Sequence, residues 1–245
     1  MNYKSGFTLA EVLITLGIIG VVAALTIPTL ISEYKERELI TKAKKAYSEI
    51  VNAIDLGRAE NGYGNNTAVF DTKNTNEEST KAFSKYFKVQ AMCKANKDGC
   101  GGKYLYKAGA PVSNNGETYD GYSISWHARF QTMSNMIIAV EQKENCKRLV
   151  ENVVRDENGI PIKDENGNEV KAETLETFCA EVIVDTNGNK EPNQIGRDIF
   201  KIQITENSFD TPNSMWAGGL QNVIKTGKLF DAVDYEIGGS LPKEE

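Results

Sequence analysis

Residues 6–28 read GFTLAEVLITLGIIGVVAALTIP, and this stretch decides how the rest of the chain is interpreted. A short polar leader with one cation, Lys4, ends in Gly6, and Phe7 then opens an apolar run that a single carboxylate, Glu11, interrupts. Residues 12–31 supply about 20 helical residues, which at about 1.5 Å each cover the ~30 Å hydrocarbon core of a bilayer. The stretch therefore predicts a membrane-spanning helix.

Glu11 is the unusual residue of this run. An ionised side chain at the centre of a membrane helix costs about 2.5–3.5 kcal/mol on insertion scales, and it normally has a partner. No cation follows Glu11 in the sequence before Lys35. Glu11 is therefore an anomaly that calls for a partner.

These residues together resemble the N-terminus of type IV pilins and of the pseudopilins of type II secretion. In that family a prepilin peptidase cuts after the glycine, here Gly6, and methylates the new amino terminus, here Phe7. Glu11 matches the family's glutamate at the fifth mature position. The resemblance implies that its partner is the Phe7 amine of a neighbouring subunit in a filament. Pro28 falls where the family often has a helix-bending proline, and the resemblance ends at about residue 60.

The resemblance implies a structural subunit of a type II secretion pseudopilus or of a type IV pilus. Such a subunit has a single span in the bacterial inner (cytoplasmic) membrane and a domain on the periplasmic or extracellular side, and it then joins a filament. The implied partners are the prepilin peptidase, other pilin or pseudopilin subunits and an inner-membrane assembly platform. The motif does not distinguish a secretion pseudopilus from an adhesive or competence pilus.

Two simpler interpretations of the N-terminus compete with this one. An ordinary secretory signal would use Lys4 as its charged region and Val22-Ala23-Ala24 as its cleavage site, but it gains nothing from Glu11 within the apolar region. An uncleaved membrane anchor leaves Gly6, Phe7 and Glu11 unexplained. A membrane-anchored exported binding domain or enzyme that does not assemble into filaments is the alternative function.

The sequence predicts an α+β fold in which a long N-terminal helical spine packs on an antiparallel β-sheet. Residues 1–6 form a leader, residues 7–30 the transmembrane and assembly segment, and residues 31–245 the exported domain. Apolar residues at three- and four-residue steps continue the helix to about Arg58, which gives about 75 Å in all, before the stop signal Glu60-Asn61-Gly62. A flexible joint at residues 26–29 is the alternative to one continuous helix.

Beyond the spine, the pattern predicts a short helix and then strands. A second helix is expected from Thr80 to about Lys94, with its aromatic residues in the core. Strands are expected at residues 104–106, 122–126, 136–140, 178–184 and 199–204, and one helical stretch near residues 220–224. Two copies of Asp-Glu-Asn-Gly, at residues 156–159 and 164–167, predict hairpin turns.

The four cysteines, Cys93, Cys100, Cys146 and Cys179, form an even set in a chain that is interpreted as exported, which favours disulfides. Three connectivities are open. A Cys93–Cys100 bridge would close a polar loop and leave Cys146 for Cys179. A metal site of four cysteines is less favoured, because the first pair is spaced more widely than in zinc knuckles.

Residues 185–200 contain a candidate calcium loop. Asp185, Asn187 and Asp198 supply oxygen ligands around a glycine turn, and the stretch resembles the late loop of some pseudopilin-like proteins that bind calcium there. It lacks the third ligand and the terminal glutamate of an EF-hand. The alternative is a turn in which these side chains accept hydrogen bonds from backbone amides.

Composition argues against other classes of function. The formal charge is −6, from 28 basic and 34 acidic residues, and no basic cluster indicates nucleic-acid binding. His127 is the only histidine, and neither a nucleophile elbow nor a phosphate-binding loop occurs. We therefore expect no enzyme and no required cofactor.

Overall fold

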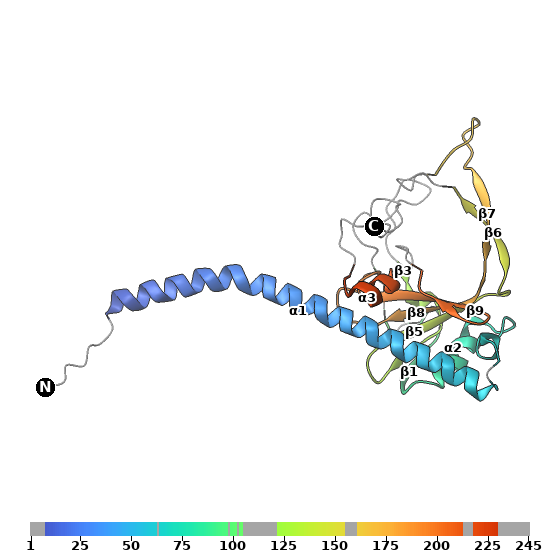
Figure 1. Cartoon of the computed structure of the whole chain (residues 1–245), viewed down its shortest axis with the longest axis horizontal. Coiled ribbons are helices and arrows are strands. Elements are labelled where there is room, and N and C mark those ends of the chain that lie inside the picture. The colour runs from blue at the N-terminus through green and yellow to red at the C-terminus, as the bar shows by residue number, and fades with distance from the viewer. Residues whose placement is uncertain are drawn as a thin grey trace. The chain divides into compact units, whose positions relative to one another are not determined.

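The structure is a computed structural model that describes residues 8–62, 64–97, 99–101, 103–104, 122–154, 161–212 and 218–229. The chain divides into two compact units, Met1–Glu38 and Leu39–Glu245. Helix α1, Leu9–Glu60, begins in the first unit and ends in the second, and Pro28 lies inside it (Figure 1). One continuous helix is therefore observed, and it ends before Gly62, whose φ of 77° suits the predicted glycine stop.

The part of α1 beyond Leu39 packs on the domain through small and branched apolar residues. Five buried positions recur at helical spacing along it: Ala43, Ala46, Ile50, Ala53 and Ile54. The alanines allow a close approach, and Gly57 extends this face, because a Cβ at Gly57 would lie 2.3 Å from Cγ2 of Val69. The amphipathic half of the spine predicted from the sequence is thus a packed helix of the domain.

A six-stranded antiparallel sheet forms the centre of the domain. Its strand order is β1-β4-β5-β8-β9-β10. The strands are β1 (Val89–Cys93), β4 (Arg129–Thr132), β5 (Ile137–Gln142), β8 (Phe178–Asp185), β9 (Ile199–Thr205) and β10 (Phe209–Asp210). The expected α+β fold, a long helix followed by an antiparallel sheet domain, is confirmed.

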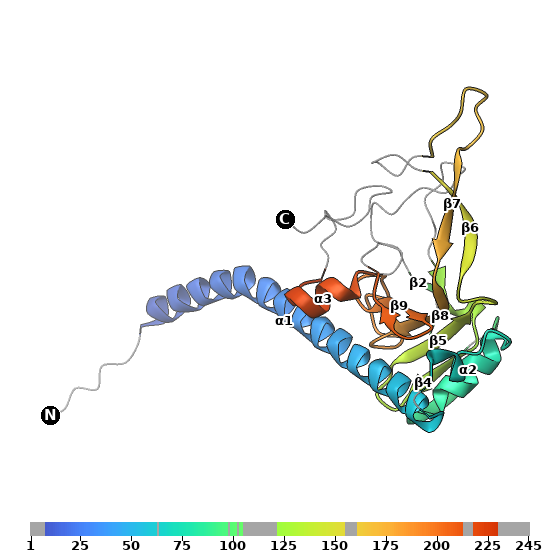
Figure 2. The same cartoon turned by 45° about the vertical axis from the view of Figure 1, so that its right-hand side comes forward.

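Short elements complete the described part of the chain. Two helices, α2 (Asn76–Ser84) and α3 (Leu220–Thr226), belong to the domain, as do the 3₁₀ turns Asn66–Ala68 and Ile124–Trp126. Two further strand pairs lie outside the main sheet: β2 (Lys103–Tyr104) with β3 (Tyr122–Ser123), and β6 (Arg148–Val153) with β7 (Lys171–Glu176). Figure 2 shows the β6–β7 pair as a ribbon that extends from the sheet.

The sheet has a core on each face, because alternate residues of its strands point to opposite sides. Ile138, Val140 and Val182 join the cluster that contains the buried residues of α1 and, from α3, Leu220 and Val223. Ile137 and Ile183 belong to a smaller cluster on the other face. All eight residues of β8 are buried, as expected for a central strand covered on both sides.

The predicted helix from Thr80 to about Lys94 was wrong at both ends. Helix α2 begins earlier, after Thr75, whose hydroxyl accepts a hydrogen bond from the N–H of Glu78 while the Glu78 carboxylate accepts one from the N–H of Thr75. Residues Val89–Cys93 form the edge strand β1, because pairing with β4 satisfies their backbone groups. The aromatic part of the prediction holds, since the Phe83 ring is fully buried and packs against Phe70 and Phe87.

The predicted strands agree in part with the structure. Strands β5, β8 and β9 and helix α3 lie where the sequence placed them. Residues 124–126 form a 3₁₀ turn instead of the end of a strand. The turn at residues 164–167 is present, since Asp164 accepts a hydrogen bond from the N–H of Asn166 and Gly167 has a φ of 83°. Residues 105–106 and 156–159 lie outside the described residues.

Candidate functional sites

The N-terminus of α1 is a capping box that includes Glu11. The Glu11 carboxylate accepts hydrogen bonds from the N–H and the hydroxyl of Thr8, both at 2.8 Å, and the Thr8 hydroxyl accepts one from the N–H of Glu11 at 3.3 Å. In the single chain Glu11 thus satisfies donors that a helix end leaves unpaired. Gly6 and Phe7 lie outside the described residues.

The apolar part of α1 has no buried residue between Leu9 and Glu38. Leu9, Leu16 and Leu25 are 79%, 61% and 73% exposed. Within the described residues, α1 is the one helix that is long and apolar enough to cross a membrane. Side chains of this kind need an apolar environment, which a bilayer or packed neighbouring helices would supply.

The loop between β8 and β9 brings Asp185, Asn187 and Asp198 together. The Asp185 carboxylate accepts hydrogen bonds from the N–H groups of Asn187 at 3.0 Å and Gly188 at 2.8 Å. The Asp198 carboxylate accepts from the N–H groups of Asn193 at 2.8 Å and Gln194 at 2.7 Å. Both aspartates are fully buried. Asp185 thus fixes the backbone at residues 187–188, and Asp198 fixes the backbone at residues 193–194.

Burial dominates the electrostatics of Asp198. It raises the pKa of this carboxyl to about 6, although the hydrogen bonds from Gln194, Asn193 and Asn187 act in the opposite direction. A buried carboxylate of this kind is costly when it is ionised without a cation. Protons and metal cations should therefore compete for the Asp198 carboxylate.

Two oxygens of this loop have no hydrogen-bond partner. Asn187 Oδ1 and Thr186 Oγ1 are buried and unpaired, and the two residues are only 4% and 3% exposed. Calcium prefers oxygen ligands of these types, so the donor set fits a calcium ion. The described residues contain no group of three or more His, Cys, Asp or Glu side chains that could hold a metal ion. Calcium at this loop stays a proposal.

The structure joins Cys93 to Cys100 and Cys146 to Cys179. The first bridge closes a loop around Arg129, a residue for which the sequence predicted no role. Arg129 is fully buried, and its guanidinium donates to the carbonyl oxygens of Lys97 at 2.9 Å and Lys94 at 3.2 Å and to that of Cys100. Its guanidinium also donates to the carbonyl oxygens of Ser125 and His127. The acceptors in the disulfide loop lie 29 to 35 residues away along the chain, so the local sequence does not mark Arg129.

His127 lies near paired charges on the face of the sheet opposite α1. Glu141 pairs with Lys143, and Glu181 pairs with Lys201 at 3.2 Å. Burial lowers the pKa of His127, so its imidazole is neutral at physiological pH. The sequence interpreted His127 as a packed or surface residue, and the half-buried side chain agrees with a packed one.

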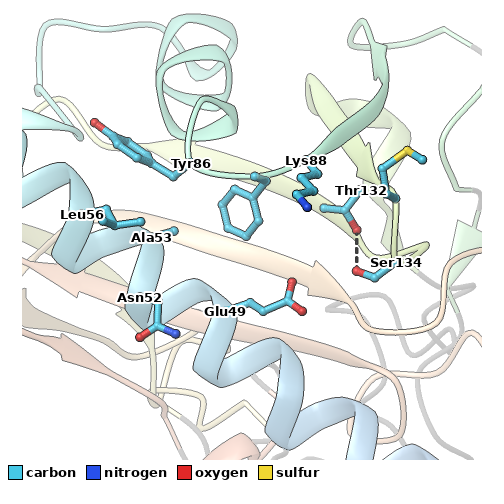
Figure 3. Close-up of a pocket in the computed structure, with 10 residues that line it drawn as sticks. Glu49, Asn52, Ala53, Leu56, Tyr86, Lys88, Thr132 and Ser134 are labelled. Carbon is cyan, nitrogen blue, oxygen red and sulfur yellow. Dashed lines mark hydrogen bonds between the residues drawn. The ribbon is translucent and has the colours of Figure 1, made fainter.

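A groove of about 350 Å³ lies between α1 and the β4–β5 turn (Figure 3). Helix α1 contributes Glu49, Asn52, Ala53 and Leu56, and the α2–β1 connection contributes Tyr86, Phe87 and Lys88. The end of β4 contributes Thr132, and the turn after it contributes Met133 and Ser134. Leu56 and Met133 are 55% and 67% exposed. The groove therefore offers apolar surface to a partner, and the sequence did not predict it.

Residues 1–27 match the family model described as the prokaryotic N-terminal methylation motif. This motif is the pilin and pseudopilin signature, and its residues include Gly6, Phe7 and Glu11. No curated protein and no solved structure matches the chain. The methylation motif, the exposed apolar helix and the two cysteine pairs are all features of a pilin-like chain.

Proposed function

Because residues 1–27 carry the N-terminal methylation motif, we propose that the chain is a filament subunit of a type II secretion pseudopilus or a type IV pilus. Prepilin peptidase cuts after Gly6 and methylates Phe7. The subunit then sits in the inner membrane through α1, with the unit from Leu39 onward outside the cytoplasm, until an assembly platform moves it into a filament. The observation that carries the proposal is a matched processing motif that runs into the apolar first part of α1, where residues 9–38 include no buried residue.

The capping box suggests that Glu11 has different partners before and after assembly. In the single chain, Thr8 satisfies the carboxylate, which lowers the cost of holding it at the start of an apolar helix. In the filament, a neighbour's Phe7 amine adds an opposite charge to a carboxylate that is already in place. Glu11 thus has one role before assembly and another within the filament.

Processing is tested by the mass of the full chain extracted from membranes. The expected chain begins at Phe7 and carries one added methyl group. A chain that begins near Leu25 would establish an ordinary secretory signal instead, and an intact chain that still begins at Met1 would establish an uncleaved anchor. Gly6→Val should block the cut, whereas Ser5→Ala, the matched change one position earlier, should not.

Assembly is tested by two substitutions of Glu11. Glu11→Gln keeps a side chain that completes the capping box but removes the charge, whereas Glu11→Ala removes both. If a charge pair with Phe7 drives assembly, both variants are processed and reach the membrane, and both fail to enter filaments beside unmodified subunits. If the Gln variant assembles as well as the parent, the charge pair is wrong and Glu11 acts only as a cap. Thr8→Ala is the control that loses the cap and keeps the charge.

The alternative function is an exported binding domain or enzyme on a membrane anchor that never assembles. A processed, methylated chain that remains monomeric in membranes alongside the full assembly machinery would favour it. Calcium at Asp185, Asn187 and Asp198 is compatible with either function. The unpaired oxygens of Asn187 and Thr186 are the observation that supports it.

A further inference from the structure

The ribbon formed by β6 and β7 exposes a pair of leucines on one face. Leu149 and Leu175 lie directly opposite each other in the antiparallel register and are 64% and 57% exposed. At the base of the ribbon, Arg148 forms an ion pair with Glu176, and its guanidinium lies 5.4 Å from the centre of the Phe178 ring. The ribbon is thus attached firmly at one end, while its leucine face is left open.

The same face of the ribbon carries one carboxylate in excess. Glu151 and Glu173 are also directly opposite each other, two residues along from the leucines, and like charges in this position repel. Lys171 pairs with Glu151 at 3.2 Å. Within the described residues this leaves Glu173 without a cation, next to exposed apolar surface.

The groove in Figure 3 is an apolar hollow, and its charged residue without an ion pair is a lysine instead of a glutamate. Its apolar lining combines buried Ala53 and half-buried Phe87 with the exposed side chains of Leu56 and Met133. Of its two charged residues, Glu49 pairs with Lys45 at 3.6 Å. Among the described residues no ion pair is found for Lys88, which leaves this cation of the groove without a partner carboxylate.

We propose that the leucine face of the ribbon docks into this groove on a second copy of the chain, with Glu173 facing Lys88. The ribbon and the groove belong to different elements, and in Figures 1 and 2 the ribbon extends away from α2 and from the end of α1. A contact between two different surfaces is heterologous, and when the rotation does not close it builds an open chain of copies. The inference rests on the filament function proposed above and assigns it a contact outside the membrane helix.

The contact is tested by photo-crosslinking in the full chain within the membranes of the cells that make it. A benzoylphenylalanine at Leu149 should give a crosslinked dimer, and mass spectrometry should place the partner peptide at Leu56, Lys88 or Met133. The same crosslinker at Thr174, on the opposite face of the ribbon, should give little dimer. Dimers from Leu149 that map elsewhere on the second copy, or crosslinks to a different protein, would overturn the inference.

Charge exchange tests the pairing of Glu173 with Lys88. Lys88→Glu or Glu173→Lys alone should lower the dimer yield roughly fivefold or more, and the two changes together should restore it. Lys85→Glu makes the same change of charge outside the groove and should leave the yield unaltered. Single variants that keep the parent's yield would refute the pairing.

A second crosslinker position separates this inference from the filament function. At Leu16, in the apolar helix, crosslinks report assembly through α1. Ladders from Leu16 without dimers from Leu149 would refute the ribbon contact and leave the filament in place. The absence of both would refute the filament and the contact together.

Discussion

Asp198 should make the domain less stable as the pH rises from about 4 to about 6 when calcium is absent. Its pKa is raised to about 6 in the folded chain, against about 3.9 for an unperturbed aspartate. Between these two values the folded state binds more protons than the unfolded state, so the free energy of unfolding falls with increasing pH. This sign is the opposite of the usual one for a carboxylate that is held ionised by a partner.

The magnitude follows from the size of the pKa difference. A difference of about 2 in pKa corresponds to about 2.4 kcal/mol between pH 4 and pH 7.5, and about 1.4 kcal/mol of this lies between pH 5 and pH 7.5. Other carboxyls contribute to the measured curve with the opposite sign. Asp164 is one of these, because hydrogen bonds from the turn, that of the Asn168 N–H foremost, lower its pKa. The contribution of Asp198 is therefore measured as a difference between the parent and Asp198→Asn.

The assay is urea unfolding of the full chain in detergent at pH 5 and pH 7.5, with a chelator present. The parent should lose about 1.4 kcal/mol more than Asp198→Asn does between the two pH values. The matched control, Asp164→Asn, removes an exposed carboxylate and should not remove this loss. If the parent and Asp198→Asn change in parallel, the raised pKa of Asp198 is wrong.

At pH 7.5, calcium should offset the loss of stability that the ionisation of Asp198 causes. If Asp185, Asn187 and Asp198 hold the ion, calcium at a hundredfold excess over Kd stabilises the folded chain by about 2.7 kcal/mol at pH 7.5. The stabilisation should weaken at pH 5, because protonation of Asp198 competes with the ion. If calcium leaves the unfolding midpoint unchanged at pH 7.5, or still shifts it in Asp185→Ala, these residues do not bind calcium. The loop is then held by its hydrogen bonds alone.

Two further predictions concern packing. Arg129→Met should destabilise the domain by about 3–5 kcal/mol, because buried carbonyls of the disulfide loop lose their donor, and a change below about 1 kcal/mol in urea unfolding would contradict this role. Gly57→Ala should also destabilise the domain, since its Cβ would lie 2.3 Å from Val69 Cγ2, although alanine is the better helix former. Gly20→Ala meets nothing within 4 Å and is the matched control; equal melting temperatures for the two variants would show that Val69 moves aside without cost.

The sequence by itself determined the features that depend on local pattern. The apolar run with its glycine, phenylalanine and glutamate predicted the methylation motif, and helical spacing through Ile54 predicted one long helix that ends near Gly62. A mostly apolar run located β8, which is buried on both faces, and apolar residues in alternation with polar ones located β9. These features are set by neighbours a few residues apart, which a sequence displays directly.

Only the tertiary structure decided the features that depend on contacts between distant residues. Val89–Cys93 has a spacing that also suits a helix, and pairing with β4 makes it a strand. Arg129 is buried because carbonyls about 30 residues earlier in the chain surround its guanidinium. The groove next to Lys88 exists only because α1, the α2–β1 connection and the β4–β5 turn meet in space. Strand pairing and the burial of a charge depend on residues that are far apart in the sequence, so a local pattern of residues cannot predict them.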